Sequence, residues 1–320
     1  MKAAVYTRYG SPEVLQIMDV PTPEPKDNEI LIRLHASSVT PSDAAMLTGK
    51  PFLIRFINGL RRPKIQILGG AISGEVVTVG RSVTKYAAGD RVYGLTTTDF
   101  GTHAQYKCLP ETAHIFKTPA GVSPEDAAGV QDALTPIYFM ENMTKLRPGQ
   151  HILINGASGA LGSYGVQIAK ILGAEVTGVC SGANVALVKS LGADHVIDYQ
   201  KADFTQNRGA YDVIFDAVGK STFGRSKKAL KPDGLYLTTV PSFHIILPML
   251  RTALFGRKKA KIGFAGLNVT PENMNTLHEY VSAGKIRTVI DRCYPLAQIA
   301  NAYRHVMTGH KVGNVVITLA

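Results

Sequence analysis

The sequence predicts an α/β protein that combines a parallel sheet, covered by helices on both faces, with a second part that is rich in β-strands. Two observations lead to this prediction. From His151 onward, short apolar runs alternate with amphipathic segments of helical period, which is the pattern of a parallel sheet with crossover helices. Before position 120, polar and apolar residues alternate with the period of strands, between bounding glycines and prolines. The length of 320 residues leaves room for both parts.

The first part of the chain contains clear strand signals. Residues 29–39 alternate between apolar and polar side chains, and residues 74–80 and 89–96 are short apolar runs that begin with glycine. Three prolines within residues 21–26 indicate an irregular connection before the first of these strands.

The pattern changes after position 122. Ser123 stands three residues before Asp126, and this spacing predicts the capped start of a helix. Strands and helices then alternate from "HILIN", which starts at His151, to "GLYLTTV", which ends at Val240. The chain closes on the strand-like segment "GNVVITLA".

The composition is that of a globular protein, with 45% hydrophobic and 18% charged residues. The three cysteines are too few and too scattered for a disulfide framework, which favours a reducing compartment. No signal peptide is visible at the N-terminus. The longest apolar segment, residues 243–256, is interrupted by His244, Pro248 and Arg251 and is too short to span a bilayer. We therefore expect a cytoplasmic protein.

The chain is strongly basic, with a formal net charge of +11 and two basic runs at residues 55–64 and 251–261. Such runs would suit an anionic partner. Neither run interleaves aromatic with basic side chains, and no nucleic-acid-binding motif accompanies them, so we expect no nucleic-acid partner. We interpret both runs as solvated loops. Peripheral contact with an anionic membrane is the weaker alternative, because neither run shows a clean amphipathic helical period.

The segment "NGASGALG", residues 155–162, lies between a predicted buried strand and a predicted helix. Its spacing, Ala157-x-Gly159-x-x-Gly162, is the dinucleotide-binding fingerprint with alanine in the first position. In this context we favour a pyrophosphate site over a purely structural turn, because the helix start presents backbone N–H groups and a Cβ would clash with the ligand. The predicted cofactor-binding residues of this loop are Gly156, Ala157, Ser158, Gly159, Ala160, Leu161 and Gly162.

The residues after the second strand of this part choose between the two nicotinamide cofactors. A carboxylate there would bind the ribose 2′-hydroxyl of NADH, but residues 178–190 contain no acidic residue. Ser181 and Asn184 can donate hydrogen bonds to a 2′-phosphate, which favours NADPH. NADH stays open, because no Lys or Arg occupies the turn.

At this point the chain resembles the medium-chain dehydrogenase/reductase superfamily, and within it the zinc-free quinone oxidoreductase-like branch. The resemblance rests on "MKAAVYTRYGSPEVLQIMDVPTPEPKDNEILIRLHASSVTPSD", "GEVVTVGRSVTKYAAGDRVYG", "AGVQDALTPIY", "LRPGQHILINGASGALGSYGVQIAKILGAEVTGVCS", "LGADHVIDY" and "GNVVITLA". These segments cover essentially the whole chain.

The resemblance implies a GroES-like catalytic domain, residues 1–124 and 291–320, into which a Rossmann domain, residues 125–290, is inserted. It also implies a homodimer formed through an edge strand, for which residues 261–269 are the candidate. Ser181 and Tyr199 take the positions that meet the 2′-phosphate in NADPH-using relatives. The remaining cofactor contacts that the resemblance implies are Thr135, Val218, Val240 and Asn314.

Zinc-dependent members of the superfamily also resemble this chain, but their metal ligands are replaced here. Thr40 stands where those relatives carry a cysteine ligand, and Gly69-Gly70-Ala71 stands where they carry Gly-His-Glu. The four-cysteine structural lobe is missing. We interpret the cluster of His103, Cys108 and His114 as strand residues, and we expect no metal site.

Without zinc, the substrates implied by the resemblance are quinones and α,β-unsaturated carbonyls, reduced by hydride from NADPH. Thr40 and Ser42 are the candidate catalytic residues, with helix-cap and turn roles as an equally good explanation. Ala45 and Ala71 replace polar groups that relatives place at the pocket. Two alternatives therefore stay open: an NADP(H)-binding redox-sensing or partner protein with vestigial catalysis, and a zinc-free alcohol dehydrogenase-like enzyme.

Overall fold

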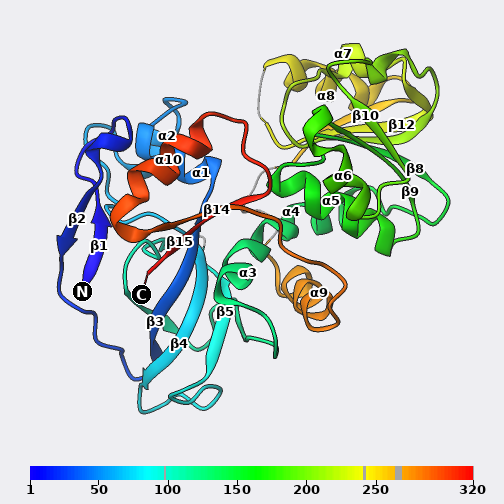
Figure 1. Cartoon of the computed structure of the whole chain (residues 1–320). Coiled ribbons are helices and arrows are strands. Elements are labelled where there is room, and N and C mark those ends of the chain that lie inside the picture. The colour runs from blue at the N-terminus through cyan, green and yellow to red at the C-terminus, as the bar shows by residue number, and fades with distance from the viewer. Residues whose placement is uncertain (97–98, 241–242, 264–268, 320) are drawn as a thin grey trace. The chain divides into compact units, whose positions relative to one another are not determined.

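A largely antiparallel sheet and a six-stranded parallel sheet form the cores of two separate units of the chain (Figure 1). The computed structural model describes residues 1–96, 99–240, 243–263 and 269–319. Unit 1 comprises Met1–Gln131 and Thr288–Ala320, and unit 2 comprises Asp132–Arg287. The α/β class, with a parallel-sheet domain inserted into a β-rich domain, is confirmed. The inner unit starts at residue 132 rather than 125 because α3 (Pro124–Gly129) packs against the strands of unit 1.

Strand β3 (Glu29–Val39) is the centre of unit 1. It alternates between buried and partly exposed side chains, and Ile30, Ile32 and Leu34 are buried in the core. The sheet has the order β14-β15-β3-β4-β5-β7, with β6 also paired to β3. In Figure 1, β15 from the red end of the chain therefore lies beside the blue β3. The bounds of the other elements are β1 (Lys2–Val5), η1 (Pro12–Val14), β2 (Gln16–Asp19), α1 (Pro41–Thr48), α2 (Ile54–Asn58), β4 (Ala71–Val79), β5 (Arg91–Leu95), β6 (Tyr106–Pro110), β7 (Ile115–Lys117), η2 (Val130–Ala133), β14 (Ile290–Pro295), η6 (Leu296–Gln298), α10 (Ile299–Met307) and β15 (Asn314–Thr318).

Unit 2 has the strand order β10-β9-β8-β11-β12-β13, and every neighbouring pair is parallel. Two successive strands follow β8 on one side and three lie on its other side, which is the order of a doubly wound dinucleotide-binding fold. The bounds are α4 (Leu134–Ile137), η3 (Tyr138–Met143), β8 (His151–Asn155), α5 (Ala160–Ile171), β9 (Glu175–Cys180), η4 (Gly182–Asn184), α6 (Val185–Ser190), β10 (His195–Asp198), η5 (Phe204–Gln206), β11 (Tyr211–Asp216), α7 (Phe223–Ser226), β12 (Leu230–Thr238), α8 (Phe243–Leu254), β13 (Lys259–Ile262) and α9 (Pro271–Ser282).

Local capping chemistry explains where several helices begin. The Ser123 hydroxyl accepts a hydrogen bond from the Asp126 amide at 3.0 Å, so the predicted cap of α3 is confirmed. Thr40 caps α1 in the same way, through the Asp43 amide at 3.2 Å.

The interpretation of both basic runs, residues 55–64 and 251–261, as loops was wrong in part, because residues 55–58 belong to α2 and residues 251–254 belong to α8. Helix α8 spans Phe243–Leu254 and includes Pro248 and Arg251. Its apolar residues lie on the exposed as well as the buried side, and this spreads the periodic signal that a one-sided helix would give.

The edge segment predicted to form a dimer, residues 261–269, contains residues 264–268, which lie outside the described part of the chain. Strand β13 is the described edge of the sheet next to it. A homodimer stays a prediction. Among the described residues, no helix is both long and apolar enough to cross a membrane.

Candidate functional site

The loop between β8 and α5 carries the three glycines of the predicted fingerprint, and two of them are required by the fold itself. Gly156 has a φ of +83°, and a Cβ on it would overlap the Val218 side chain. A Cβ on Gly162 would overlap the carbonyl oxygen of Gly156, so this glycine lets the first turn of α5 pack against the loop.

Gly159 has neither of these reasons to be glycine. Its φ of −78° and ψ of 175° are accessible to any residue. A Cβ built on it would lie 3.4 Å from the Gly156 carbonyl oxygen, which is ordinary van der Waals contact. The fold therefore leaves room for a side chain at position 159, so a bound ligand rather than the fold explains the glycine. A pyrophosphate that lies against the backbone would clash with a side chain there, so the loop fits a dinucleotide.

The start of α5 supplies the donors for such an anion. The helix begins at Ala160 without a side-chain cap, so its first N–H groups lack partners within the helix and sit at the positive end of its dipole. The Ser158 hydroxyl accepts a hydrogen bond from the Asn184 side chain at 3.0 Å and can still donate its own proton. This bond also ties the glycine loop to the turn after β9.

The sheet of unit 2 changes direction between β8 and β11, because the chain winds from β8 toward β10 on one side and from β11 toward β13 on the other. In open α/β sheets, ligands bind at the carboxyl ends of the strands beside such a switch point. Asn155 ends β8 and Asp216 ends β11, and the Asn155 amide donates to the Asp216 carboxylate at 2.9 Å. The predicted glycine loop therefore starts at the switch point.

Asp216 is a functional candidate that the sequence reasoning missed. Its side chain is fully buried. One carboxylate oxygen accepts from the Asn155 side chain and from the amides of Val218 and Gly219, and the other accepts from the Ser221 amide and the Tyr236 hydroxyl. The carboxylate thereby holds the loop that carries Val218. Its position at the end of a buried strand, followed by Gly219, is the signal that could have identified it.

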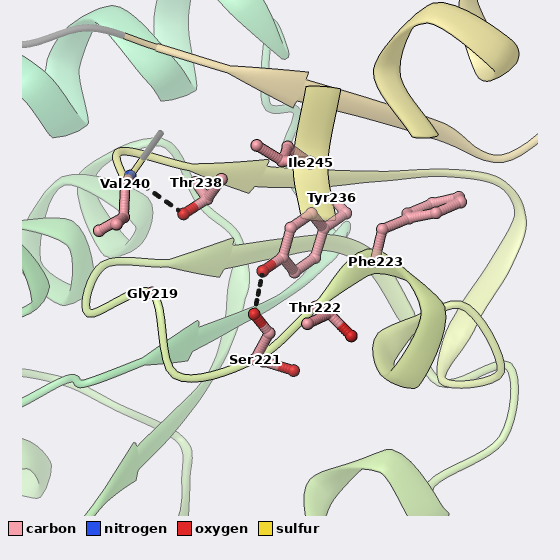
Figure 2. A pocket seen from close by; sticks show the side chains of 8 residues that line it. All are labelled: Gly219, Ser221, Thr222, Phe223, Tyr236, Thr238, Val240 and Ile245. Atoms are coloured by element: carbon pink, nitrogen blue, oxygen red, sulfur yellow. Dashed lines mark hydrogen bonds between the residues drawn. The ribbon is translucent and has the colours of Figure 1, made fainter. Parts of the chain in front are cut away.

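Val218 and Val240 present exposed side chains on adjacent loops at this edge. The loops approach closely, since a Cβ on Gly219 would lie 2.7 Å from the Val240 side chain. A small hollow lies beside Val240 (Figure 2), and in it the Tyr236 hydroxyl donates to the Ser221 carbonyl oxygen at 3.2 Å. The hollow is lined by Gly219, Ser221, Thr222, Phe223, Tyr236, Thr238, Val240 and Ile245.

The predicted 2′-phosphate residues lie at the carboxyl ends of β9 and β10. Ser181 follows β9, and Tyr199 follows β10 with an exposed side chain. Because β10 pairs with β9 in the register Asp198↔Cys180, the fold also brings a carboxylate here. The Asp198 oxygen lies 2.7 Å from the position of a Cβ on Gly182. The sequence argument that no acid is near the ribose was therefore incomplete.

The Asp198 carboxylate has a basic neighbour. The ammonium of Lys201 lies 4.0 Å from it, with a largely exposed side chain. A cation beside the turn compensates part of the negative charge that Asp198 would direct at a 2′-phosphate. The turn after β9 contains no basic residue, and Lys201, which follows β10, supplies a positive charge beside it.

In unit 1, the candidate catalytic hydroxyl of Thr40 is already engaged. It accepts from the Asp43 amide and donates to the Asp43 carboxylate at 2.7 Å. The same buried carboxylate accepts from the Thr40 and Gly69 amides. Thr40 therefore completes a capping box, and its proton is committed to Asp43. The spacing Thr40-x-x-Asp43 is the sequence signal for this arrangement.

The other predicted residues divide between the two units. Ser42 is exposed in the first turn of α1, and Asn314 is buried, with its side-chain amide donating to the Val289 carbonyl oxygen at 3.1 Å. Thr135 is buried in α4 of unit 2. The predicted residues of the glycine loop, together with Ser181, Asn184, Tyr199, Val218 and Val240, lie at the carboxyl edge of one sheet, whereas Thr40, Ser42 and Asn314 belong to unit 1.

His103 belongs to a buried hydrogen-bonded network. Its Nε2 lies 3.1 Å from the Ser38 carbonyl oxygen, which can only accept, so Nε2 carries the proton. Its Nδ1 then accepts from the Tyr303 hydroxyl at 3.2 Å. Burial lowers the pKa of His103 and keeps the ring neutral. Within the described ranges, no group of three His, Cys, Asp or Glu residues is arranged to hold a metal ion.

The parallel sheet, its switch point and the glycine loop define a protein of the dinucleotide-binding class. Family models extend this to both units: "Alcohol dehydrogenase GroES-like domain" matches residues 26–122, and "Zinc-binding dehydrogenase" matches residues 191–317. A chloroplast envelope quinone oxidoreductase homolog of Arabidopsis thaliana is 30% identical, over 99% of this chain and 98% of that protein. The chain therefore belongs to the medium-chain dehydrogenase/reductase superfamily, in its quinone oxidoreductase-like branch.

Other relatives agree with this assignment. A chloroplastic NADPH-dependent alkenal/one oxidoreductase of Arabidopsis thaliana is 28% identical, over 99% of this chain and 79% of that protein. The solved structure of a quinone oxidoreductase from Coxiella burnetii has a TM-score of 0.87 and 29% identity, and covers 100% of this chain and 99% of its own. A mycobacterial protein solved in complex with NADPH has a TM-score of 0.83 and 25% identity, with 99% of both chains covered.

Proposed function

We propose that this protein transfers hydride from NADPH to a quinone or an α,β-unsaturated carbonyl compound, without zinc. The observation that carries the proposal is Gly159, whose lack of a side chain is explained by a dinucleotide and by nothing in the fold. The names of the quinone oxidoreductase and alkenal/one oxidoreductase relatives support the substrate class. The replacement of the metal-ligand positions by Thr40 and by Gly69-Gly70-Ala71 supports zinc independence.

In this proposal the cofactor supplies the hydride, and the chain binds and orients it. The N-terminus of α5 and Ser158 bind the pyrophosphate, and Ser181, Tyr199 and Lys201 bind the 2′-phosphate. Val218, fixed by the Asp216 carboxylate, packs against the nicotinamide end. Because the Thr40 proton is committed to Asp43, the proton that completes the reduction comes from the Ser42 hydroxyl or from water.

The direct test is oxidation of NADPH by the purified full-length chain. We expect turnover with 1,2-naphthoquinone, 9,10-phenanthrenequinone or 2-alkenals, measured as the loss of NADPH absorbance. The Gly159→Val variant is the negative control, and metal analysis of the active protein tests the zinc. Intact NADPH binding with no turnover across the whole panel would refute the proposed reaction, and stoichiometric zinc would refute its metal independence.

A second candidate is an NADP(H)-binding redox-sensing or partner protein without turnover. Two observations favour it: the Thr40 hydroxyl is bound to Asp43, and Ala45 and Ala71 offer no polar group in its place. Tight NADPH binding by fluorescence titration, combined with no turnover, would support this candidate. Oxidation of alcohols with NADP⁺ in a metal-free preparation would instead support an alcohol dehydrogenase-like enzyme.

We further propose a homodimer in the cytoplasm. The three cysteines carry no disulfide in the described structure, which is consistent with a reducing compartment. Sedimentation velocity of the purified chain tests the dimer, and a monomer at all concentrations would refute it.

A further inference from the structure

Helix α8 of unit 2 exposes a continuous apolar face. Leu247, Leu250 and Leu254 have 71%, 58% and 79% of their surface exposed, and Phe255, directly after the helix, has 70% exposed. Successive residues rotate by about 100° around a helix. Among residues 245–254, whose side chains the structure describes, the exposed large apolar residues therefore share one sector about 100° wide: Ile246, Leu247, Leu250 and Leu254.

The opposite side of α8 is fixed to its own unit. Ile245 is buried in the core cluster beneath the helix. Thr252 is buried, and its hydroxyl accepts from the Ala260 amide of β13 at 3.1 Å. The helix cannot turn its leucines inward without breaking these contacts. The leucines of this sector therefore stay exposed in folded unit 2.

The segment that carries this face is strongly basic. Residues 251–261 contain five basic residues and no acidic one: Arg251, Arg257, Lys258, Lys259 and Lys261. Asp233 pairs with Arg257, with 2.9 Å between its carboxylate and the Arg257 Nε. Lys259 donates to the Thr252 carbonyl oxygen, which keeps its charge at α8, whereas Lys258 donates to the carbonyl oxygens of Lys227 and Leu230. Within the described part of the chain, Arg257 is the one of these five in an ion pair, so four of the charges have no carboxylate partner there.

We propose that α8 and Phe255 form a peripheral docking face for an anionic lipid bilayer. A helix of this kind lies in the interface with its apolar face in the headgroup boundary and its basic side chains on the headgroups. A second copy of this chain fits less well, because twofold pairing of the face would bring its basic segments together. The proposal goes beyond the proposed function and does not depend on it.

The test is sedimentation of the full-length chain with vesicles. Vesicles of phosphatidylcholine and phosphatidylglycerol pellet the protein at low salt, whereas pure phosphatidylcholine vesicles do not. The double variant Leu250→Gln/Leu254→Gln lowers the partition coefficient by roughly tenfold or more, since each leucine loses its transfer into the apolar layer. The matched control is Ile17→Gln/Met18→Gln in β2, which removes exposed apolar surface from unit 1 and leaves partitioning unchanged.

The charge is tested separately. Arg251→Gln lowers partitioning by about fivefold, and Arg208→Gln, an exposed arginine elsewhere in unit 2, leaves it unchanged. Thermal unfolding shows that every variant is folded. Pelleting that survives the double leucine variant, or protein that stays in the supernatant at low salt, would overturn the proposal. So would a dimer in solution that the leucine variant dissociates, because α8 would then be a self-interface.

Discussion

Substituting Gly159 and Gly162 separately distinguishes a glycine required by a ligand from one required by the fold. In Gly159→Val, the new side chain enters a position where a Cβ meets only the Gly156 carbonyl oxygen, at 3.4 Å, and the backbone dihedrals suit valine. The free energy of unfolding without cofactor should therefore change by about 1 kcal/mol or less. In Gly162→Ala, a single methyl group overlaps the backbone of Gly156, which cannot move away as the end of a flexible side chain could.

The expected cost of Gly162→Ala is about 1–3 kcal/mol, which lowers the unfolding temperature by roughly 2–4 °C per kcal/mol for a unit of this size. Binding shows the opposite order. Gly159→Val displaces the pyrophosphate from charge-assisted hydrogen bonds worth about 1.5–3 kcal/mol each. Loss of two such bonds raises the NADPH dissociation constant by about a hundredfold or more, since 1.4 kcal/mol corresponds to tenfold.

Fluorescence titration with NADPH and thermal unfolding without it give both quantities. Unchanged affinity in Gly159→Val would refute the assignment of the loop to the pyrophosphate. If Gly159→Val instead lowered the unfolding temperature as much as Gly162→Ala, the glycine would be structural, and the reasoning from its surroundings would fail.

Three further predictions follow from the buried and paired groups. Asp198→Asn removes a negative charge beside the ribose, so the KM for NADPH should fall severalfold while the KM for NADH stays nearly constant. A parallel change for both cofactors would show that Asp198 does not lie near the 2′-phosphate. Asp216→Asn turns one acceptor into a donor that faces hydrogen-bond donors, and it should cost about 1–3 kcal/mol in thermal unfolding; a variant as stable as the parent would contradict the network. Burial lowers the pKa of His103 below the ordinary histidine value of 6.5, so the unfolded chain takes up a proton as the pH falls through that value, before the folded chain does. Stability should therefore fall as the pH drops below about 6.5, and His103→Phe should flatten this slope; an unchanged slope would show that His103 does not cause it.

The sequence predicts the features whose signals come from residues close together in the chain. The alternation of apolar runs with amphipathic segments predicts the parallel sheet, and a glycine turn between β8 and α5 predicts the anion site. Ser123 caps α3 where its spacing to Asp126 places it. Each of these signals lies within a few positions of the feature that it predicts.

The missed residues depend on pairing between distant segments. Asp198 reaches Gly182 because β10 and β9 are in a particular register, and the Asp216 carboxylate accepts a hydrogen bond from Asn155, which lies 61 positions earlier. The sequence did not predict helix α8 because its apolar residues lie on both its buried and its exposed side. The periodic pattern identifies a helix that is apolar on one side only.

The sheet order of unit 1 has a consequence for the sequence of events during synthesis. Residues 36–39 of strand β3 pair with β15, which follows every other described strand in the sequence. All six strands of the unit 2 sheet have been made once Ile262 is complete, so this sheet can form on the ribosome while the edge of β3 still waits for its partner. Strand β3 thus completes its pairing only after every strand of the unit 2 sheet has been made. A chain that stops before Asn314 would leave residues 36–39 of β3, which are buried in the complete sheet, open to pairing with other chains.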